Sequence, residues 1–351
     1  MHQGTERDRS GDGSTSRKGE HLRINIDQDV RAKGISAGFE RYRFEHCALP
    51  EISLDDVDLS VTHFGRTLRV PLLISCMTGG TPEATGVNRT LARIAQEFGF
   101  AMGLGSGRVL LENPSALESF DVRSVAPDVL LFANLGAVQL NKGYGVPQCR
   151  HLVNLVHADG LVLHLNPLQE ALQPEGDTDF GGLLARIGEL ANGLHVPVLV
   201  KEVGWGLSSD VVRALLDCGV AGVDVAGAGG TSWSEVERHR THESYRIRVA
   251  AQFAAWGIPT TECIRDARAV APDSLIIASG GIRNGLDATK SIALGADLVG
   301  IAGLFLRAAA QGFDEVHDLA REIVEVMRIA MFALGLRSVE ELKLTDKLIE
   351  Q

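Results

Sequence analysis

A dense group of hydrogen-bonding side chains stands in the stretch HLNPLQE, residues 164–170. His164, Asn166, Gln169 and Glu170 follow directly on the apolar run GLVL, which is typical of the end of a buried β-strand. An ordinary surface turn does not need that density of imidazole, amide and carboxylate groups. The stretch therefore indicates polar side chains that face a ligand, although His164 could instead be a hydrogen-bonded core residue.

A second unusual residue is Lys201, which ends the apolar run VLVK. A lysine buried without a partner costs several kcal/mol, on the order of the cost of any unpaired buried charge. We therefore expect Lys201 to meet an anion or an electron-rich ring, and a salt bridge with Glu202 is the structural alternative.

Glycine-rich turns are the third signal. SGGIRNG, residues 279–285, precedes a helix expected to begin near Leu286, and IAG, residues 301–303, follows the next apolar run. Backbone N–H groups at such turns and at helix N-termini bind phosphate. Arg283 can add a cation to this site or lie on the surface.

These residues all follow short apolar runs, and the chain contains eight such runs. Their continuous apolar character is expected of parallel strands covered on both faces, and amphipathic helical stretches such as residues 88–99 and 208–219 lie between them. Eight alternating units over about 240 residues match a (β/α)₈ TIM barrel, with a doubly wound sheet as the alternative. In a barrel the residues at the C-terminal ends of the strands form the active site. The eight runs are residues 70–75, 100–106, 129–136, 160–166, 196–203, 222–227, 274–281 and 298–303.

Composition limits the function classes. The net charge of -11 argues against a general nucleic-acid or anionic-membrane binder, and no run reaches the ~18 apolar residues of a membrane span. The five cysteines are spaced without CxxC pairs, which favours reduced thiols in a cytoplasmic protein. Residues 1–16 lack an apolar signal-peptide region and read as a disordered leader.

Flavin mononucleotide (FMN) fits the phosphate turns and Lys201 together, and the whole set of motifs resembles the FMN-dependent type II isopentenyl diphosphate isomerases. The resemblance covers Arg17 to about Lys343. It rests on RKGEH (17–21), FEHCALPE (44–51), MTGG (77–80), GSGR (105–108), ANLG (133–136), HLNPLQE (164–170), VKEVGWG (200–206), GAGGTSW (227–233) and SGGIRNG (279–285).

The resemblance implies a role for each matching residue. Gln169 would hold the alkene end of the substrate, His164 and Asn166 would orient substrate and flavin, and Glu170 would bind Mg²⁺. The implied diphosphate ligands are Arg17, Lys18, His21, Ser106, Gly107 and Arg108. The implied FMN ligands are Met77, Thr78, Gly79, Ser106, Asn134, Lys201, Thr231, Gly281, Ile282, Arg283, Ala302 and Gly303.

The implied reaction converts isopentenyl into dimethylallyl diphosphate without net redox change, with FMN reduced by NADPH serving as acid and base through its ring nitrogens. The family also implies a homo-oligomer, a tetramer or an octamer. The expected organisation is a leader (1–16), an N-terminal substrate-binding segment and barrel cap (17–69), the barrel (70–343) and a C-terminal tail (344–351).

Three other classes are the alternatives. An FMN-dependent α-hydroxy-acid oxidase needs a histidine base and paired arginines, which the residues before SGGIR do not offer, and IMP-dehydrogenase-like barrels need a catalytic cysteine loop. A non-catalytic flavin-binding barrel would keep the glycine turns but not Gln169 and Glu170.

Overall fold

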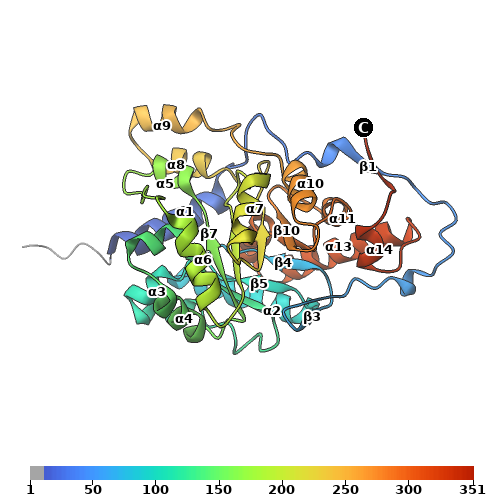
Figure 1. Cartoon of the computed structure of the whole chain (residues 1–351), viewed down its shortest axis with the longest axis horizontal. Helices are drawn as coiled ribbons and strands as arrows, with labels where there is room; N and C mark the ends of the chain where they lie inside the picture. The colour runs from blue at the N-terminus through green and yellow to red at the C-terminus, as the bar shows by residue number, and fades with distance from the viewer. Residues whose placement is uncertain (1–11) are drawn as a thin grey trace, which may run out of the picture.

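The computed structural model describes residues 12–351, and eight parallel strands close into one barrel (Figure 1). All eight predicted runs form these strands, in the barrel order β10-β11-β4-β5-β6-β7-β8-β9. Pairing of β11 with β4 closes the sheet, which excludes the doubly wound alternative. The barrel strands are β4 (Leu72–Ile74), β5 (Ala101–Gly103), β6 (Leu131–Gly136), β7 (Gly160–His164), β8 (Val198–Lys201), β9 (Gly222–Asp224), β10 (Leu275–Ser279) and β11 (Leu298–Ile301).

Helices such as α2 cover the outside of the barrel with an apolar face, which in α2 includes Val87, Leu91 and Ile94. α2 shows how the sequence sets helix limits: Thr81 caps its first turn through the Ala84 N–H, and Gly99 ends it in the left-handed conformation at φ 73°. The predicted end at Gly99 is confirmed, whereas the helix begins at Pro82, earlier than residue 88. α7 and α11 begin at Ser209 and Gly285, close to the predicted starts.

Helices, 3₁₀ turns and short strands surround the barrel. The helices are α1 (Asp12–Asp27), α2 (Pro82–Phe98), α3 (Arg108–Glu112), α4 (Val146–Leu155), α5 (Pro167–Leu172), α6 (Leu183–Gly193), α7 (Ser209–Asp217), α8 (Trp233–Arg240), α9 (Ser244–Ala251), α10 (Thr260–Val270), α11 (Gly285–Ala293), α12 (Gly303–Gln311), α13 (Phe313–Phe332) and α14 (Val339–Lys343). The 3₁₀ turns are η1 (Phe39–Arg41), η2 (Leu54–Asp56), η3 (Pro114–Ser119) and η4 (Ala137–Lys142), and the strands that precede the barrel are β1 (Tyr42–Phe44), β2 (Val61–His63) and β3 (Arg66–Leu68).

The segment predicted as one cap, residues 17–69, is divided between the two ends of the barrel. α1 packs against α8 and α12 and contributes to the cavity at the C-terminal ends of the strands. The β2–β3 hairpin lies at the opposite end, where Leu68 joins a core cluster with Leu73 and Phe132, and Phe64 contacts Phe132 edge-on at 6.2 Å. Only the first part of this segment can therefore reach a ligand.

The C-terminal residues are part of the fold. β12 (Leu348–Glu350) pairs antiparallel with β1, with Tyr42 opposite Glu350, and Figure 1 shows the two strands side by side. Arg265 Nη1 donates a hydrogen bond to Glu350 Oε2 at 2.9 Å, which ties the pair to α10. The predicted tail is thus a strand that holds the N-terminal segment.

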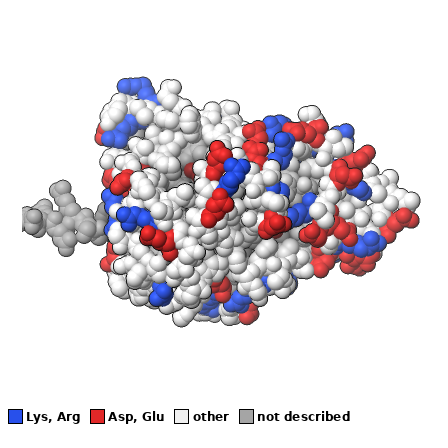
Figure 2. Space-filling view, in the orientation of Figure 1, with Lys and Arg blue, Asp and Glu red and all other residues white. Residues whose placement is uncertain are grey.

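Most of the predicted leader lies outside the described residues, and its last five residues, 12–16, belong to α1. Within residues 12–351, no helix is both long and apolar enough to cross a membrane. The face seen in Figure 2 carries acidic and basic side chains intermixed, with acidic groups frequent near one end. That surface agrees with the net charge of -11.

Candidate active site

A cavity of about 720 Å³ opens at the C-terminal ends of the barrel strands. Its volume is within the range of about 300–1,000 Å³ that small-molecule and cofactor sites occupy. Residues from the ends of strands all around the barrel line it, together with α1, residues 28–31, α8 and α12. The cavity therefore has the place and size that the barrel rule predicts for an active site.

The ends of β10 and β11 form one side of the cavity. Gly281, Ile282 and Arg283 line it after β10, and Ala302 and Gly303 line it after β11. α12 begins at Gly303, so the N–H groups of its first turn have no partner within the helix. A Cβ atom on Gly230 would lie 2.5 Å from the Gly281 nitrogen, which shows that the backbones of the two turns are in direct contact.

Cations surround these turns. Arg283 Nη2 donates to the Gly229 carbonyl at 3.3 Å, and Arg307 of α12 also lines the cavity. Thr231, from the loop after β9, lines the same side. This group of backbone N–H donors, a hydroxyl and guanidinium groups has the chemistry of a phosphate site.

Lys201 lines the floor of the cavity and is 8% exposed. Its ammonium donates to the backbone carbonyl of Glu202, not to the carboxylate. The Glu202 carboxylate instead accepts the N–H groups of residues 203–206 through one oxygen. The alternative of a side-chain salt bridge between these neighbours is thus not what the structure forms.

The charge of Glu202 is affected by its surroundings. Burial raises its pKa to about 7, although the backbone N–H groups of Trp205 and Gly204 favour the ionised form. The carboxylate of Glu202 stabilises the loop of residues 203–206, because all four of its backbone donors belong to that loop.

Asn134 connects the floor with the stretch HLNPLQE. Its Oδ1 lies 3.0 Å from His164 Nδ1, and its Nδ2 donates to the Val162 carbonyl at 3.2 Å. Asn134 is buried, which makes this orientation rigid. His164 is half-buried and lines the cavity, so it is not a core residue, and Asn134 holds its ring in place.

Asn166, Gln169 and Glu170 form a network at the start of α5. Asn166 Nδ2 donates to Gln169 Oε1 at 3.1 Å and to Glu170 Oε1 at 2.8 Å. Gln169 Nε2 donates to Glu237 Oε1 at 3.2 Å. The amide of Gln169 is consequently fixed between a donor on one side and an acceptor on the other.

Glu170 has a fixed carboxylate at the cavity wall. Its Oε2 accepts the Asp177 N–H at 2.7 Å, and each oxygen retains a lone pair for a further ligand. Within residues 12–351, no group of three or more His, Cys, Asp or Glu side chains is arranged to hold a metal ion. A metal here would take Glu170 together with water or phosphate oxygens, which is the habit of Mg²⁺.

Glu237 of α8 is buried, and it is the centre of a charged cluster that sequence reasoning missed. Arg240 Nε donates to its Oε2 at 2.7 Å, and His21 Nε2 lies 3.0 Å from its Oε1. Burial alone would raise the pKa of Glu237, but His21 and Arg240 outweigh it and hold the pKa at about 2. The His21 ring also contacts Trp233 edge-on at 5.2 Å.

Only some of the predicted diphosphate ligands line the cavity. Ser106 and Arg108 line the cavity, and Arg108 Nε donates to Glu112 at 2.7 Å. Gly107 is not in the cavity wall: a Cβ there would lie 2.5 Å from Leu152, so the residue is needed for close packing. Arg17 and Lys18 lie in α1, and their side chains are outside the described part of the structure.

Met77, Thr78 and Gly79, which are among the implied FMN ligands, line the cavity after β4. The Thr78 carbonyl accepts from Gly105 N at 3.0 Å and from Asn88 Nδ2 at 3.2 Å. Gly79 lies against Phe120, because a Cβ there would be 2.3 Å from that ring. The wall after β4 therefore presents backbone and the Met77 and Thr78 side chains to the cavity.

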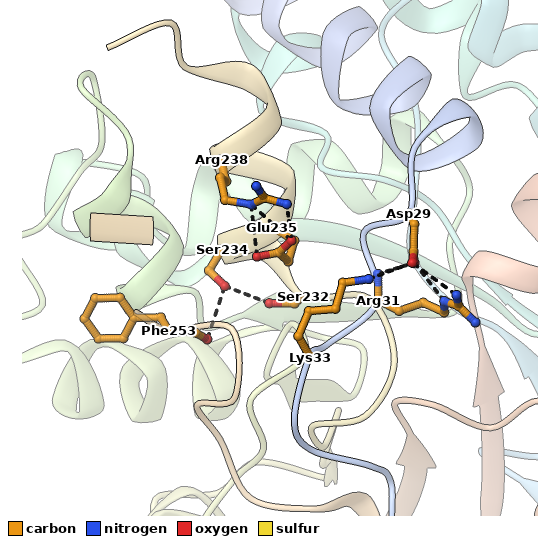
Figure 3. A network of polar contacts seen from close by, with 8 residues as sticks. All are labelled: Asp29, Arg31, Lys33, Ser232, Ser234, Glu235, Arg238 and Phe253. Carbon is orange, nitrogen blue, oxygen red and sulfur yellow. Dashed lines mark hydrogen bonds and ion pairs between the residues drawn. The ribbon is translucent and has the colours of Figure 1, made fainter. Parts of the chain in front are cut away.

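Residues 28–34 form a strap that carries Asp29, Arg31 and Lys33 (Figure 3). Residues 28–31 line the edge of the cavity, and Arg31 forms a β-bridge with Thr231. Ala32 N donates to Gly230 O at 2.9 Å and Ser232 N donates to Val30 O at 2.8 Å. Within the strap, hydrogen bonds from Arg31 and Lys33 hold the pKa of Asp29 well below its usual range. These contacts fix the strap to the loop that carries Thr231.

Figure 3 also shows how the start of α8 is held. Ser232 and Ser234 share a hydrogen bond at 2.8 Å, Ser234 donates to the Phe253 carbonyl, and Arg238 donates to Glu235. α8 is therefore anchored at its first turn, which places Trp233 at the cavity and Glu237 behind Gln169.

The site contains residues that the strand-end rule does not identify. Trp233 and Glu237 are on a helix, four residues apart and hence on one face. Trp233 is the last residue of the motif GAGGTSW, and the position of Glu237 four residues later is a signal that could have pointed to it. Arg31, Gln173 and Arg307, which also line the cavity, have no such signal.

Comparison with known proteins agrees with this geometry. The chain is 48% identical to the isopentenyl-diphosphate delta-isomerase of Nostoc sp. over 93% of this chain and 94% of that protein. It is 50% identical to that of Synechocystis sp. (96% and 97% covered) and 54% identical to that of Synechococcus sp. (90% and 91% covered). Residues 174–350 match the family described as FMN-dependent dehydrogenase.

Solved structures with the same architecture include mandelate oxidase, with a TM-score of 0.64, 18% identity, and 96% and 98% of the two chains covered. A flavocytochrome b2 variant has a TM-score of 0.68 at 16% identity, with 95% and 83% covered. At such identities the likeness shows the barrel fold alone.

Proposed function

We propose that this chain, which belongs to the isopentenyl-diphosphate delta-isomerase family, interconverts isopentenyl and dimethylallyl diphosphate with the help of bound FMN. The observation that carries the proposal is one cavity with two kinds of wall. The ends of β10 and β11 offer phosphate-binding groups, and the network around Gln169 offers fixed polar groups. An isomerase that uses a phosphorylated cofactor and a diphosphate substrate needs both.

The residues present fit FMN. Gly281, Ile282, Arg283, Ala302, Gly303 and Thr231 would hold the phosphate, and Met77, Thr78, Gly79, Ser106, Asn134 and Lys201 would surround the ring. The buried, unpaired Ser75 hydroxyl at the cavity floor offers a further polar contact to a ring above it. When bound and reduced, FMN would supply the acid and base of the reaction at its ring nitrogens.

The diphosphate would lie on the α1 side of the cavity. His21, Ser106 and Arg108 line that part, and Arg17 and Lys18 belong to the same helix as His21. Gly107 would contribute to diphosphate binding only by allowing the loop to pack closely against Leu152, where a Cβ atom would not fit. Arg108 would have to exchange its contact with Glu112 for a phosphate, which is favourable because a dianion attracts guanidinium more strongly.

Glu170 would bind Mg²⁺, and this ion would offset the charge of the diphosphate. Its two oxygens are held by Asn166 Nδ2 and Asp177 N, so the carboxylate is already oriented before a metal arrives. One carboxylate is enough, because Mg²⁺ shares phosphate oxygens and keeps several waters.

Gln169 would contact the alkene end of the substrate. Its amide cannot titrate, so its role is placement: Asn166 and Glu237 fix which face of the amide is turned to the cavity. His164 would act with Asn134 in the same way toward the ring. Rigid placement of this kind supplies much of the rate of enzymatic reactions.

The proposal includes NADPH as the reductant of FMN, a cytoplasmic location and a homo-oligomer, a tetramer or an octamer. The solvent-exposed aromatic and apolar residues near α9 support association: Tyr245, Val249 and Trp256 are 52%, 46% and 61% exposed.

A spectroscopic and isotopic assay tests the function. Pure protein loaded with FMN and Mg²⁺ is reduced once without oxygen, with dithionite in one sample and NADPH in another, and given isopentenyl diphosphate in deuterated water. We expect many turnovers per reduction, deuterium in the methyl group of dimethylallyl diphosphate, and no activity of the oxidised protein. Stoichiometric consumption of NADPH, or oxidation of a 2-hydroxy acid instead, would contradict the proposal, and a yellow protein inert toward isopentenyl diphosphate would indicate a flavin-binding barrel.

A further inference from the structure

A buried carboxylate lies beneath the cavity floor, and the proposed reaction gives it no role. Asp224 is the last residue of β9 and is 3% exposed. It stands directly beside Lys201 in the pairing of β8 with β9, so both side chains leave the sheet on the same face. Lys201 lines the cavity, whereas Asp224 does not. Asp224 can therefore act on a ligand only through space or through its neighbours.

Asp224 is held firmly in this place. Ser279 Oγ of β10 donates to Asp224 Oδ1 at 2.5 Å, and Ala226 N donates to the same oxygen at 3.2 Å. Ser279 itself lines the cavity, so the carboxylate lies one side chain below it. Burial raises the pKa of Asp224, and the charge of Lys201 and these two donors oppose that effect by stabilising the ionised form.

Lys201 has two buried carboxylates nearby, but only one is available to balance its charge from within the barrel. Glu202 uses an oxygen for the four N–H groups of residues 203–206, on the loop side of the strand end. Asp224 does not accept a row of loop N–H groups in this way. Ala226 N and Ser279 Oγ both donate to its Oδ1 and not to its second oxygen. Burial raises the pKa of the Cys76 thiol, which lies after β4 on the opposite side of the barrel. The charge of Lys201 lowers this pKa and that of Asp224 raises it, so both charges lie in one interior region.

We propose that Asp224 is a positioning residue that sets the electrostatic potential at the FMN ring by offsetting the charge of Lys201. This inference rests on the proposed binding of FMN. A lysine alone beside the ring favours the electron-rich reduced cofactor and its anionic form. A carboxylate behind that lysine weakens the preference, because opposite charges act strongly over short distances in a buried region.

The offset has a chemical purpose in an isomerase. Protonation of an alkene requires a reduced ring that keeps its protons, and an uncompensated cation would lower the pKa of that ring. The Asp224 charge thus keeps the ring in the form that the proposed acid chemistry uses. A redox enzyme that passes on electrons has no need of this restraint.

The test is the midpoint potential of bound FMN, measured by equilibrium reduction against reference dyes. Asp224→Asn removes the negative charge with little change in volume. We expect the reduced form to become at least tenfold more favoured, which for two electrons is a rise of about 30 mV. The pKa of the reduced ring, followed by its absorbance, is expected to fall in the same variant.

Two further variants make the result decisive. Asp210→Asn removes a carboxylate that is 90% exposed on α7, and we expect no change in potential. Ser279→Ala removes a donor to Asp224, so the carboxylate binds a proton more readily and the potential rises by a smaller amount. If Asp224→Asn fails to fold, the Ser279→Ala result decides alone.

The outcomes separate this inference from the proposed function. An unchanged potential in a flavin-loaded Asp224→Asn variant, or in Ser279→Ala if the first does not fold, would overturn the role of Asp224. Failure of the unaltered protein to bind FMN would instead overturn the proposed function.

Discussion

His21 Nε2 of α1 lies 3.0 Å from Glu237 Oε1 of α8, and this contact joins the helix over the cavity to the network around Gln169. Gln169 and Gln173 both donate to the same oxygen of Glu237. The position of α1 is therefore coupled to the orientation of the amide that would face the substrate. A change in the charge of His21 or Glu237 is therefore expected to affect both the position of α1 and the orientation of the Gln169 amide.

Replacing His21 by Ala is expected to raise KM for isopentenyl diphosphate about tenfold or more and to lower kcat less, with FMN content unchanged. The reason is that a diphosphate ligand is lost while Gln169 keeps its other contacts. Steady-state kinetics of the reduced enzyme measure the split. His317→Ala is the matched control, because His317 also lies beside a glutamate, Glu97, on the outer surface. A fall in kcat alone would remove His21 from the substrate site.

Glu237 predicts a pH dependence of stability. Its folded pKa of about 2 is below the ordinary value of 4.5, so it stabilises the fold above about pH 4.5, and this contribution is lost as the pH falls toward 2. The shift corresponds to a stabilisation on the order of 3 kcal/mol at neutral pH. Glu237→Gln should therefore narrow the difference in Tm between pH 7 and pH 3. Parallel curves of Tm against pH for the two proteins would show that folding does not lower the pKa of Glu237.

Glu170→Gln is expected to keep FMN but lose Mg²⁺-dependent activity by at least a hundredfold. The amide oxygen can still accept from Asp177 N, whereas the amide nitrogen replaces the oxygen that accepts from Asn166 Nδ2, so the substitution removes the charge of the proposed metal ligand and one hydrogen bond. Titration of activity with Mg²⁺ checks this, and Glu189→Gln on the exposed part of α6 serves as control. An unchanged Mg²⁺ response would remove Glu170 from the metal site.

Lys201→Ala is expected to weaken FMN binding at least tenfold and to make the cofactor harder to reduce. The variant removes a cation from a buried floor where it would contact the ring. Fluorescence titration with FMN measures the affinity, and Lys33→Ala in the exposed strap provides the control. Wild-type affinity and potential would assign Lys201 a purely structural role.

The sequence was sufficient for the barrel and for much of the cavity wall. Continuous apolar runs predict the strands, and the rule that ligands bind at their C-terminal ends then selects Asn134, His164, Lys201 and Thr231 without knowledge of any contact. These residues lie at the cavity because their strand positions place them there.

The contacts formed by helices could not be predicted in this way. Glu237 is 68 residues from Gln169 in sequence, and only the packing of α8 against α1 and α5 brings the two side chains together. At Gly107 the motif suggests a ligand contact, but tertiary packing gives another reason for the residue. Close packing against Leu152 leaves no room for a Cβ atom there. The division of residues 17–69 between the two barrel ends likewise depends on tertiary packing.

The pairing of β1 with β12 has a consequence for the order of folding during synthesis. Tyr42 bonds Glu350, which is 308 residues later in the chain. At about 5–20 residues per second, a ribosome needs roughly 15–60 s to make the segment between them. The β1 strand has no β12 partner during that time. The fold of the N-terminal segment around β1 therefore cannot be completed until the last residues of the chain have been made.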